Sequence, residues 1–254
     1  MDTTLLIQGK LDSRVYDFYC YHYQDYPKIF STWYNNDVSN SIWVNNLYLK
    51  DFHKYNTKVL LNDYPPDIFI SKEQNRHLQI WSTIKGLQQV KTEKVIKLRG
   101  DEVYSNLNTI KIHENKITCA PIYFKSWRQY PYHISDHIIA GYTENLEKMF
   151  YGALSKIYDK DEINRITPEY KNLVTETLLG ISYLEEKFNI QFDFSDKSRQ
   201  IFVENFDILN LESLKPYCVT ANYIKKTWYS DFIPEHNDSI SNIEDSYIIR
   251  RKKI

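Results

Sequence analysis

The 254-residue chain contains 42% hydrophobic and 26% charged residues, a composition typical of a globular protein and unlike that of a disordered one. Its formal net charge of −1 provides no overall field that would attract nucleic acid or an anionic membrane. No apolar stretch approaches the ~20 residues that span a membrane, and the N-terminus lacks the basic and apolar regions of a secretory signal.

The cysteines and the absence of familiar motifs narrow the class of protein further. Cys20, Cys119 and Cys218 are odd in number and far apart, which fits neither a disulfide framework nor a zinc site, so we expect a reducing, cytoplasmic location. The chain has no GxGxxG, GxxxxGKS, GxxxxGKT, GxSxG or HExxH motif. These absences argue against a classical dinucleotide fold, a P-loop nucleotide site, a serine hydrolase and a histidine-bound metal.

The first half of the chain alternates strands with helices. Short apolar runs that end in polar residues, glycine or proline predict strands, and apolar residues at helical spacing predict helices. In chain order these elements are a strand at 4–7, a helix at 13–23, strands at 28–33 and 58–62, a helix from Ser71 to Leu87, and a strand at 94–98. This alternation predicts an α/β fold with a mainly parallel sheet, right-handed crossovers and helices on both faces.

The second half is less regular. The pattern predicts a strand at 116–124, a loop leading into a helix at 136–150, a long helix at 168–188, and a strand with a flanking turn at 198–209. No internal repeat, low-complexity linker or break in composition marks a boundary between domains. The expectation is therefore a single domain over residues 1–254.

Polar residues follow each predicted strand of the first half. In a mainly parallel sheet the ligand site lies beyond the carboxyl ends of the strands, so these residues are expected at one edge. They are Gln8 and Gly9, Ser31 and Thr32, Asn62 and Asp63, and the segment Arg99 to Glu102. Each of the first three pairs also fits the ordinary polarity of strand ends.

The segment Lys97-Leu-Arg-Gly-Asp-Glu102 is the sharpest chemical signal. Alternate residues of a strand point to one side, so Lys97, Arg99 and Asp101 can face a single space. The adjacent carboxylates of Asp101 and Glu102 can hold a hard divalent cation, which usually bridges substrate phosphates. Two other readings remain open: a solvated turn with an internal ion pair, and an exposed Arg-Gly-Asp adhesion tripeptide.

Two more carboxylates stand where loops lead into predicted helices. Asp136 is a candidate general base or substrate clamp, although Ser135 or Asp136 could instead cap the following helix. Glu169 is a second candidate, although its place in a helix's first turn, after a good cap at Thr167, also has a purely structural explanation.

Taken in order, several short motifs resemble the WavE-type lipopolysaccharide-synthesis family, regarded as glycosyltransferases. No single motif is specific, but the ordered set, running from about Leu5 to Tyr170, is more so. The motifs are Leu5-Leu-Ile-Gln-Gly9, Phe30-Ser-Thr-Trp33, Asn75-Arg76 with Ser82-Thr83 and Gly86-Leu87, Lys97-Leu-Arg-Gly-Asp101, and Ile134-Ser-Asp136 with Gly141.

The resemblance implies a GT-A-like, Rossmann-like single domain. Residues 1–107 would form its nucleotide-sugar-binding half, and residues 108–254 its acceptor side and C-terminal elements. Such an enzyme moves a sugar from a UDP-, GDP- or dTDP-sugar to a hydroxyl of a glycan or lipid-linked acceptor, in the synthesis of surface polysaccharide, lipopolysaccharide or glycoprotein glycans. Separately from the resemblance, the net charge argues against a nucleic acid partner, and the basic tail Arg250-Arg-Lys-Lys253 allows at most peripheral contact with a membrane.

The resemblance also assigns roles to individual residues. Lys97 to Glu102 occupies the position of the Asp-x-Asp metal motif. The residues that would contact the donor are Gln8, Gly9, Thr32, Asn62, Asp63, Asn75, Arg76, Lys97 and Arg99. Those that would hold Mn²⁺ or Mg²⁺ are Asp101 and Glu102, and the proton acceptor would be Asp136, with Glu169 second.

This chain departs from the Asp-x-Asp pattern, because Arg99 replaces the first aspartate. Either Asp101 holds a metal on the diphosphate with Arg99 adding positive charge, or Arg99 and Lys97 neutralise the diphosphate alone. The same substitution keeps open a catalytically inactive, glycosyltransferase-like scaffold. An attachment or binding protein that uses the Arg-Gly-Asp tripeptide is the other alternative.

Overall fold

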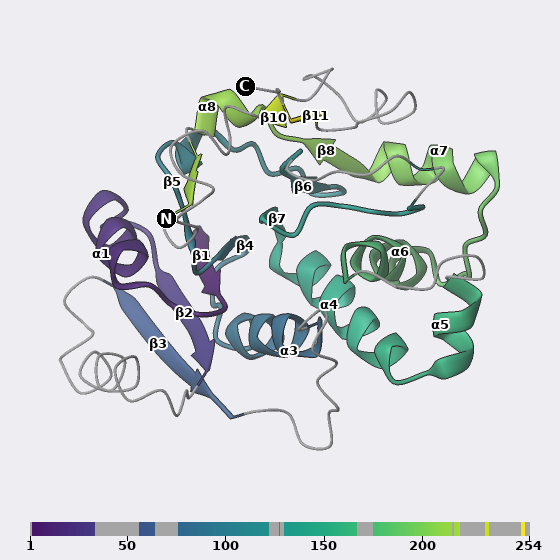
Figure 1. Ribbon diagram of the computed structural model, residues 1–254, viewed down its shortest axis with the longest axis horizontal. Coiled ribbons are helices and arrows are strands. Elements are labelled where there is room, and N and C mark those ends of the chain that lie inside the picture. Colours follow the sequence, from purple (N-terminus) through teal and green to yellow (C-terminus); the bar gives the residue numbers. More distant parts are fainter. Residues whose placement is uncertain are drawn as a thin grey trace.

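The computed structural model describes residues 2–33, 56–63, 76–121, 127, 130–166, 175–214, 216–218, 232–233 and 250–251 (Figure 1). Its helices are α1 (Ser13–His22), α3 (Arg76–Leu87), α4 (Thr143–Ile157), α5 (Lys160–Ile166), α6 (Thr175–Phe188), α7 (Asp196–Asn205) and α8 (Leu211–Leu214), with a 3₁₀ turn at Leu107–Thr109. Its strands are β1 (Thr3–Gln8), β2 (Lys28–Trp33), β3 (Thr57–Asn62), β4 (Lys94–Arg99), β5 (Glu102–Tyr104), β6 (Ile117–Cys119), β7 (Ile138–Tyr142), β8 (Phe206–Ile208), β9 (Pro216–Cys218), β10 (Phe232–Ile233) and β11 (Arg250–Arg251).

A seven-stranded sheet forms the centre, with the strand order β3-β2-β1-β4-β7-β6-β8. The strands β3, β2, β1 and β4 are all parallel, and β6 and β8 are parallel to each other. Only β7 runs antiparallel to its two neighbours in this sheet, β4 and β6. The predicted α/β arrangement of a mainly parallel sheet flanked by helices is confirmed.

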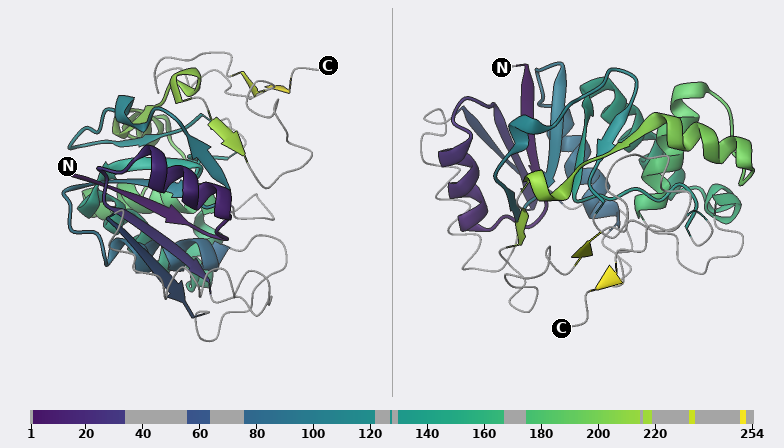
Figure 2. Two further views of the ribbon diagram at one scale, coloured as in Figure 1. Left: turned by 90° about the vertical axis from the view of Figure 1, so that its left-hand side faces the viewer. Right: turned by 90° about the horizontal axis from the view of Figure 1, so that it is seen from above.

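The sheet has a separate hydrophobic core on each face, as the alternation of side chains along a strand requires. Leu5 and Ile7 of β1 pack with α1, whereas Leu6 between them packs with α3 on the opposite face. Along β4, Val95 likewise belongs to the α3 face and Ile96 to the α1 face. In Figure 1 and in the right-hand view of Figure 2, α1 lies at one end of the molecule and α5 and α7 at the other.

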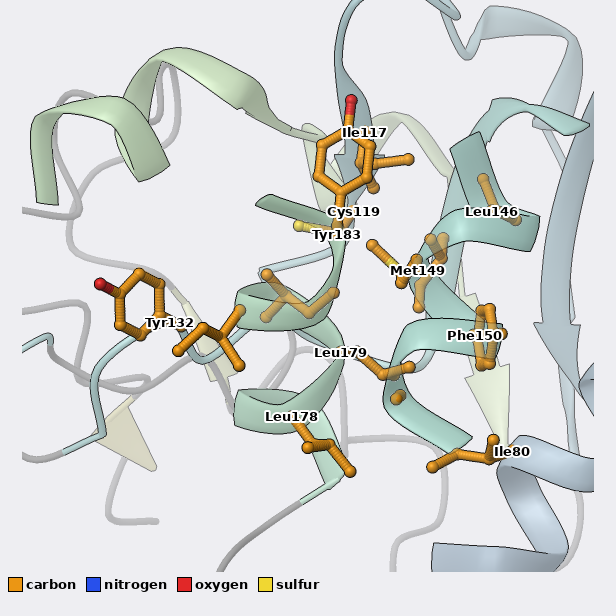
Figure 3. Packing of buried hydrophobic residues seen from close by; sticks show 14 of the residues in the cluster. Ile80, Ile117, Cys119, Tyr132, Leu146, Met149, Phe150, Leu178, Leu179 and Tyr183 are labelled. Atoms are coloured by element: carbon orange, nitrogen blue, oxygen red, sulfur yellow. The ribbon is translucent and has the colours of Figure 1, made fainter. Parts of the chain in front are cut away.

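The larger core is built by α3, α4 and α6. Met149 and Phe150 of α4 and Leu178 and Leu179 of α6 belong to this core, and all four side chains are fully buried (Figure 3). Burying a side chain of this size stabilises a fold by about 1.5–3 kcal/mol before entropy is counted. The helix α6 is therefore firmly placed, and this matters because its first turn lies beside the functional site.

In the second half of the chain, the structure differs from the sequence-based prediction in two elements, β7 and α7. The segment expected as a loop before α4 contains β7, whose apolar run Ile138-Ile-Ala is completely buried between β4 and β6. The predicted strand at 198–209 is wrong over most of its length: residues up to Asn205 belong to α7, and only 206–208 form a strand. Ser195 explains the helix, because its hydroxyl caps the first turn by accepting from the backbone N–H of Ser198.

The first half agrees closely with prediction. The strands β1 to β4 and the helix α1 match their expected positions to within a residue or two. The expected start of the α3 helix at Ser71 lies outside the described residues, as do the beginning of the long helix at 168 and the end of the strand predicted at 116–124. The division into halves at residue 107 stays a prediction, as does the single-domain boundary.

Within the ranges that the structure describes, no helix has both the length and the apolar character needed to cross a bilayer.

A close backbone contact fixes α6 against the segment 130–137. The backbone N–H of Ile134 donates to the carbonyl of Glu176 at 3.4 Å. A Cβ placed on Gly180 would lie 1.9 Å from the carbonyl oxygen of Tyr132, so only glycine allows this approach. The position of the 130–137 segment relative to α6 thus depends on one missing methyl group.

We predict that Gly180→Ala destabilises the protein by about 3 kcal/mol or more, because the clashing atom belongs to backbone and cannot rotate away. Gly152→Ala in α4 is the matched control. Its new Cβ would lie 2.8 Å from Cγ of the exposed Glu186, which can move, and 3.3 Å from Cβ of Ser182, which needs to shift only slightly. The change should therefore stay within about 1 kcal/mol. Urea denaturation measures both variants, and equal stabilities would contradict the role given to Gly180.

Candidate functional site at the carboxyl edge of the sheet

The carboxyl ends of the parallel strands bring the predicted residues together. Gln8 lies opposite Ser31 on one side and Arg99 on the other, and Asn62 lies opposite the last residue of β2. Gly9 turns the chain away from β1 with a φ of 107°, a conformation that favours glycine. The predicted gathering of these strand ends at one edge is confirmed.

The polar residues at the ends of β2 and β3 are largely engaged with one another. The side-chain amide of Asn62 donates to the Ser31 hydroxyl and to the Thr32 carbonyl, both at 2.8 Å. Ser31 in turn donates to the carbonyl of Ser82 at 2.6 Å. Both amide hydrogens of Asn62 are therefore used, so a ligand could meet only its side-chain oxygen, whereas Asp63 is exposed.

The Arg-Gly-Asp tripeptide is held within the site. The N–H of Gly100 donates to the carbonyl of Gln8 at 2.7 Å, and a Cβ on Gly100 would lie 2.7 Å from the carbonyl of Lys10. Arg99 and Asp101 form a two-pronged ion pair, with Nε–Oδ1 and Nη2–Oδ2 distances of 3.0 and 3.1 Å. The two charged side chains thus bind each other, a geometry that disfavours the adhesion reading.

Lys97 is the innermost cation of the site. Strand alternation places it on the same face as Val95, beneath the α3, α4 and α6 helices, and its side chain is fully buried. Its Nζ donates to the backbone carbonyl of Asp136 at 2.5 Å. Burial lowers the pKa of Lys97, and the nearby carboxylates of Asp136 and Glu102 partly offset this effect.

Arg99 lies further out and touches three carboxylates. Besides Asp101, its Nε lies 3.5 Å from Glu102 Oε1 and its Nη1 lies 3.7 Å from Asp136 Oδ2. Its side chain is 36% exposed, against 24% for Asp101 and none for Glu102. Arg99 therefore joins the buried part of the cluster to the part that a ligand can reach.

Glu102 is fully buried and its carboxylate is already occupied. The hydroxyl of Tyr104 donates to Oε2 at 2.6 Å, and Nδ1 of His137 lies 2.7 Å from Oε1. Glu102 therefore does not fit the metal-ligand role predicted for it. Within the described ranges, no group of three or more His, Cys, Asp and Glu side chains is arranged to hold a metal ion. Asp101, with its partly exposed carboxylate, keeps its predicted role as a proposal.

Asp136, the first candidate for the general base, is locked into the same network. The side-chain amide of Gln79 donates to its Oδ2 at 2.5 Å, and only 5% of the residue is exposed. Burial by itself would raise the pKa of Asp136, but the charges of Lys97 and Arg99 outweigh it and hold the pKa well below its ordinary value. A carboxylate with so low a pKa is a weak proton acceptor at neutral pH.

Glu176, in the first turn of α6, was missed by the sequence analysis. Burial, and then repulsion from the Asp136 carboxylate, raise its pKa to about 7. An acidic residue near the start of the predicted helix could have drawn attention to it, but the candidate chosen there was Glu169. Glu169 lies outside the described residues, so its role is not addressed by the structure.

Two predicted donor contacts also remain open. Asn75 lies outside the described residues, and Arg76 is the first residue of α3, with a side chain that the structure does not describe. The same helix does reach the site, through Gln79 one turn further on. Gln79 and His137 are the other two contributors that the sequence analysis did not select.

Comparison with models of known protein families shows to which family this chain belongs. The model of the WavE lipopolysaccharide synthesis family matches residues 22–178, more than half of the chain. This chain belongs to the WavE family. The matched residues include β4, the segment 130–137 and the first turn of α6, which together carry the charged cluster. No curated protein matches the chain.

Solved structures give only distant likenesses to this WavE-family chain. The glycosyltransferase GlyE of Streptococcus pneumoniae TIGR4 has 10% identity and a TM-score of 0.44, over 82% of this chain and 45% of the GlyE chain. HddC of Yersinia pseudotuberculosis, complexed with GMP-PN, has 12% identity and a TM-score of 0.36, over 74% of this chain and all of HddC. The chain thus spans less than half of the GlyE chain that it matches, and neither likeness identifies a ligand.

We predict that Tyr104→Phe destabilises this WavE-family protein by about 1.5–3 kcal/mol, because the fully buried Glu102 carboxylate loses the hydrogen bond from the Tyr104 hydroxyl. Tyr21→Phe, at a side chain of a residue that is 73% exposed, is the control and should change stability by less than about 0.5 kcal/mol. Urea denaturation at neutral pH compares the two, and an undisturbed Tyr104→Phe variant would mean that Glu102 is satisfied in another way.

Proposed function

We propose that the protein is a glycosyltransferase that moves a sugar from a nucleoside-diphosphate donor to a hydroxyl of a glycan or lipid-linked acceptor in lipopolysaccharide-type polysaccharide synthesis. The observation that carries the proposal is membership of the WavE family together with a mixed charge cluster at the carboxyl edge of the parallel sheet. Ligands of open α/β sheets bind at this edge. Free, buried thiols at Cys20 and Cys119 suit the cytoplasmic location expected from the sequence.

The fixed charges suit the departure of a nucleoside diphosphate. As the bond between the sugar and the diphosphate breaks, negative charge grows on the leaving oxygen, and Arg99 is the cation that a ligand can reach. Lys97, behind it, cannot touch a ligand because it is fully buried, but its field acts on the same region. Arg99 is thus the proposed direct contact and Lys97 the supporting charge.

A divalent cation fits this arrangement at Asp101 alone. Two cations, Lys97 and Arg99, face the carboxylates of Asp101, Glu102 and Asp136, so a bound metal ion would add positive charge for the diphosphate beyond that of Arg99. Asp101 is the accessible member, and Mg²⁺ or Mn²⁺ is commonly held by one or two carboxylates together with substrate phosphates. When bound, such an ion would neutralise charge on the diphosphate.

The remaining predicted donor contacts belong to the same proposal. Gln8 and Gly9 lie at the turn after β1, next to Arg99, where a nucleotide could approach backbone closely. Thr32, Asn62 and Asp63 lie at the ends of β2 and β3, on the side where the base or ribose is expected. The donor nucleotide would then extend across β1, β2 and β3 with its diphosphate at β4.

We predict that one nucleotide sugar among UDP-glucose, UDP-galactose, UDP-N-acetylglucosamine, GDP-mannose and dTDP-rhamnose binds at least about tenfold, or about 1.4 kcal/mol, more tightly when Mn²⁺ is present. Asp101→Asn should abolish this dependence on Mn²⁺. Glu102→Gln should instead lower the stability of the fold, because His137 and Arg99 lose the negative charge that they face. Calorimetric titration with and without Mn²⁺, together with urea denaturation, measures both effects.

The matched control is Asp17→Asn, at an exposed position of α1, which should leave donor affinity and its Mn²⁺ dependence unchanged. Loss of the Mn²⁺ effect in Glu102→Gln, but not in Asp101→Asn, would reverse the metal assignment. No binding of any nucleotide sugar under either condition would sink the enzyme proposal. Binding without release of a nucleoside diphosphate, even with a lipopolysaccharide core oligosaccharide added, would favour the inactive scaffold.

A further inference from the structure

One more carboxylate, beside the charged cluster, is placed to act in the reaction. We propose that Glu176, in the first turn of α6, accepts the proton of the sugar-acceptor hydroxyl, and that Asp136 instead holds the cations of the site in place. This inference rests on the proposed glycosyltransferase function and deepens it, because it names the residue for the one chemical step that the cations cannot perform.

The packing of α6 brings Glu176 to the site. Its own carbonyl accepts from the N–H of Ile134, two residues before Asp136. One turn further along the helix, Gly180 lies directly on the carbonyl of Tyr132, so the helix cannot move away from this segment without losing both contacts. Glu176 is therefore held beside Asp136 by backbone contacts and does not depend on its own side chain for its position.

The two carboxylates differ in what they can reach. Asp136 is 5% exposed, and its Oδ2 accepts from Gln79 and faces Arg99. Glu176 is only partly buried, and the hydrogen bond that acts on its carboxylate comes from its own backbone. A substrate hydroxyl can thus approach Glu176, whereas reaching Asp136 would require its present partners to be displaced.

The surroundings shift the pKa values of Glu176 and Asp136 in opposite directions. The groups that act on Glu176 are Asp136 and His137 from the segment 130–137, and Arg99 and Lys97 from β4. Burial and the repulsion from Asp136 dominate and raise the pKa of Glu176 to about 7, whereas the two cations hold the pKa of Asp136 far down. A proton acceptor is most effective when its pKa lies near the working pH, which favours Glu176.

The step balances with Glu176 as the acceptor of the proton. The acceptor hydroxyl gives its proton to the ionised Glu176 carboxylate while its oxygen forms a bond to the anomeric carbon. The bond from that carbon to the diphosphate oxygen breaks, and the electron pair leaves with the nucleoside diphosphate next to Arg99. Because attack and departure occur on opposite sides of the anomeric carbon, the product has inverted configuration.

We predict that Glu176→Gln lowers the rate of sugar transfer by about 100-fold or more while donor affinity stays within about threefold of the wild type. The substrates are the nucleotide sugar selected by titration and lipopolysaccharide core oligosaccharide, and the measurement is the initial rate of nucleoside diphosphate release. Glu186→Gln, at an exposed position of the same helix, is the matched control and should keep the full rate.

The dependence of the rate on pH separates a chemical role from a structural one. Since the ionised form accepts the proton, the wild-type kcat should fall as the pH drops below about 7. Asp136→Asn removes a repulsion that raises the pKa of Glu176, so the same fall should move to lower pH. An unmoved pH profile in Asp136→Asn, a near-normal rate in Glu176→Gln, or a product with retained configuration would overturn the assignment.

A titration without any substrate keeps the inference testable if the variants fold poorly or no donor is turned over. With glutamate side chains labelled with ¹³C, one carboxyl resonance of the wild type should titrate near pH 7 and be missing in Glu176→Gln. Absence of such a resonance overturns the Glu176 assignment. Its presence in a protein that turns over no nucleotide sugar shows that the proposed function, and with it the transfer step, has failed while the titrating carboxyl stands.

Discussion

The arrangement of the site depends on one buried ammonium group. Lys97 points from the central strand β4 into the core beneath α6, and its Nζ donates to the backbone carbonyl of Asp136. A buried charge is tolerated only when it is paired and hydrogen-bonded, so Lys97 forces the segment 130–137 to lie over β4 with its carboxylate nearby. Arg99 and Gln79 both contact the Asp136 carboxylate, and α6 contacts the same segment through the hydrogen bond between Ile134 and Glu176.

Much of the fold could be predicted from the sequence, because the patterns that define its elements lie within short segments of the chain. The alternating strands and helices of the first half carry clear apolar periods and end in polar turns, so β1 to β4 and the edge formed by Gln8, Ser31 and Arg99 follow from pattern alone. The strand β7 was missed because a short, fully buried run such as Ile138-Ile-Ala has no alternation to reveal it. The α7 helix was missed because Ile201-Phe-Val favours a strand, while the cap at Ser195 decides for a helix.

The site could be only half predicted, since half of it comes from distant segments. Lys97, Arg99 and Asp101 adjoin in sequence and share a face, so their meeting follows from strand geometry. Glu102 does not follow the same rule, because the chain turns at Gly100 and β5 joins a separate small sheet with β9, which takes Glu102 into the interior. Gln79, His137 and Glu176 reach the cluster only through the packing of α3, β7 and α6, and packing of that kind leaves no motif in the sequence.

The cluster thus has a fixed inner part and an accessible outer part, and this division governs what mutations can reveal. Glu102 and Asp136 are buried and engaged by Tyr104, His137 and Gln79. Replacing either carboxylate by a neutral group leaves the cations that face it without a counter-charge and costs about 3–5 kcal/mol. Loss of activity in an inner variant is therefore no evidence of a chemical role unless folding is measured beside it. The outer carboxylates, Asp101 and Glu176, can be changed at smaller structural cost than Arg99, which also faces the buried Glu102 and Asp136. Variants of these two carboxylates can therefore separate binding from chemistry.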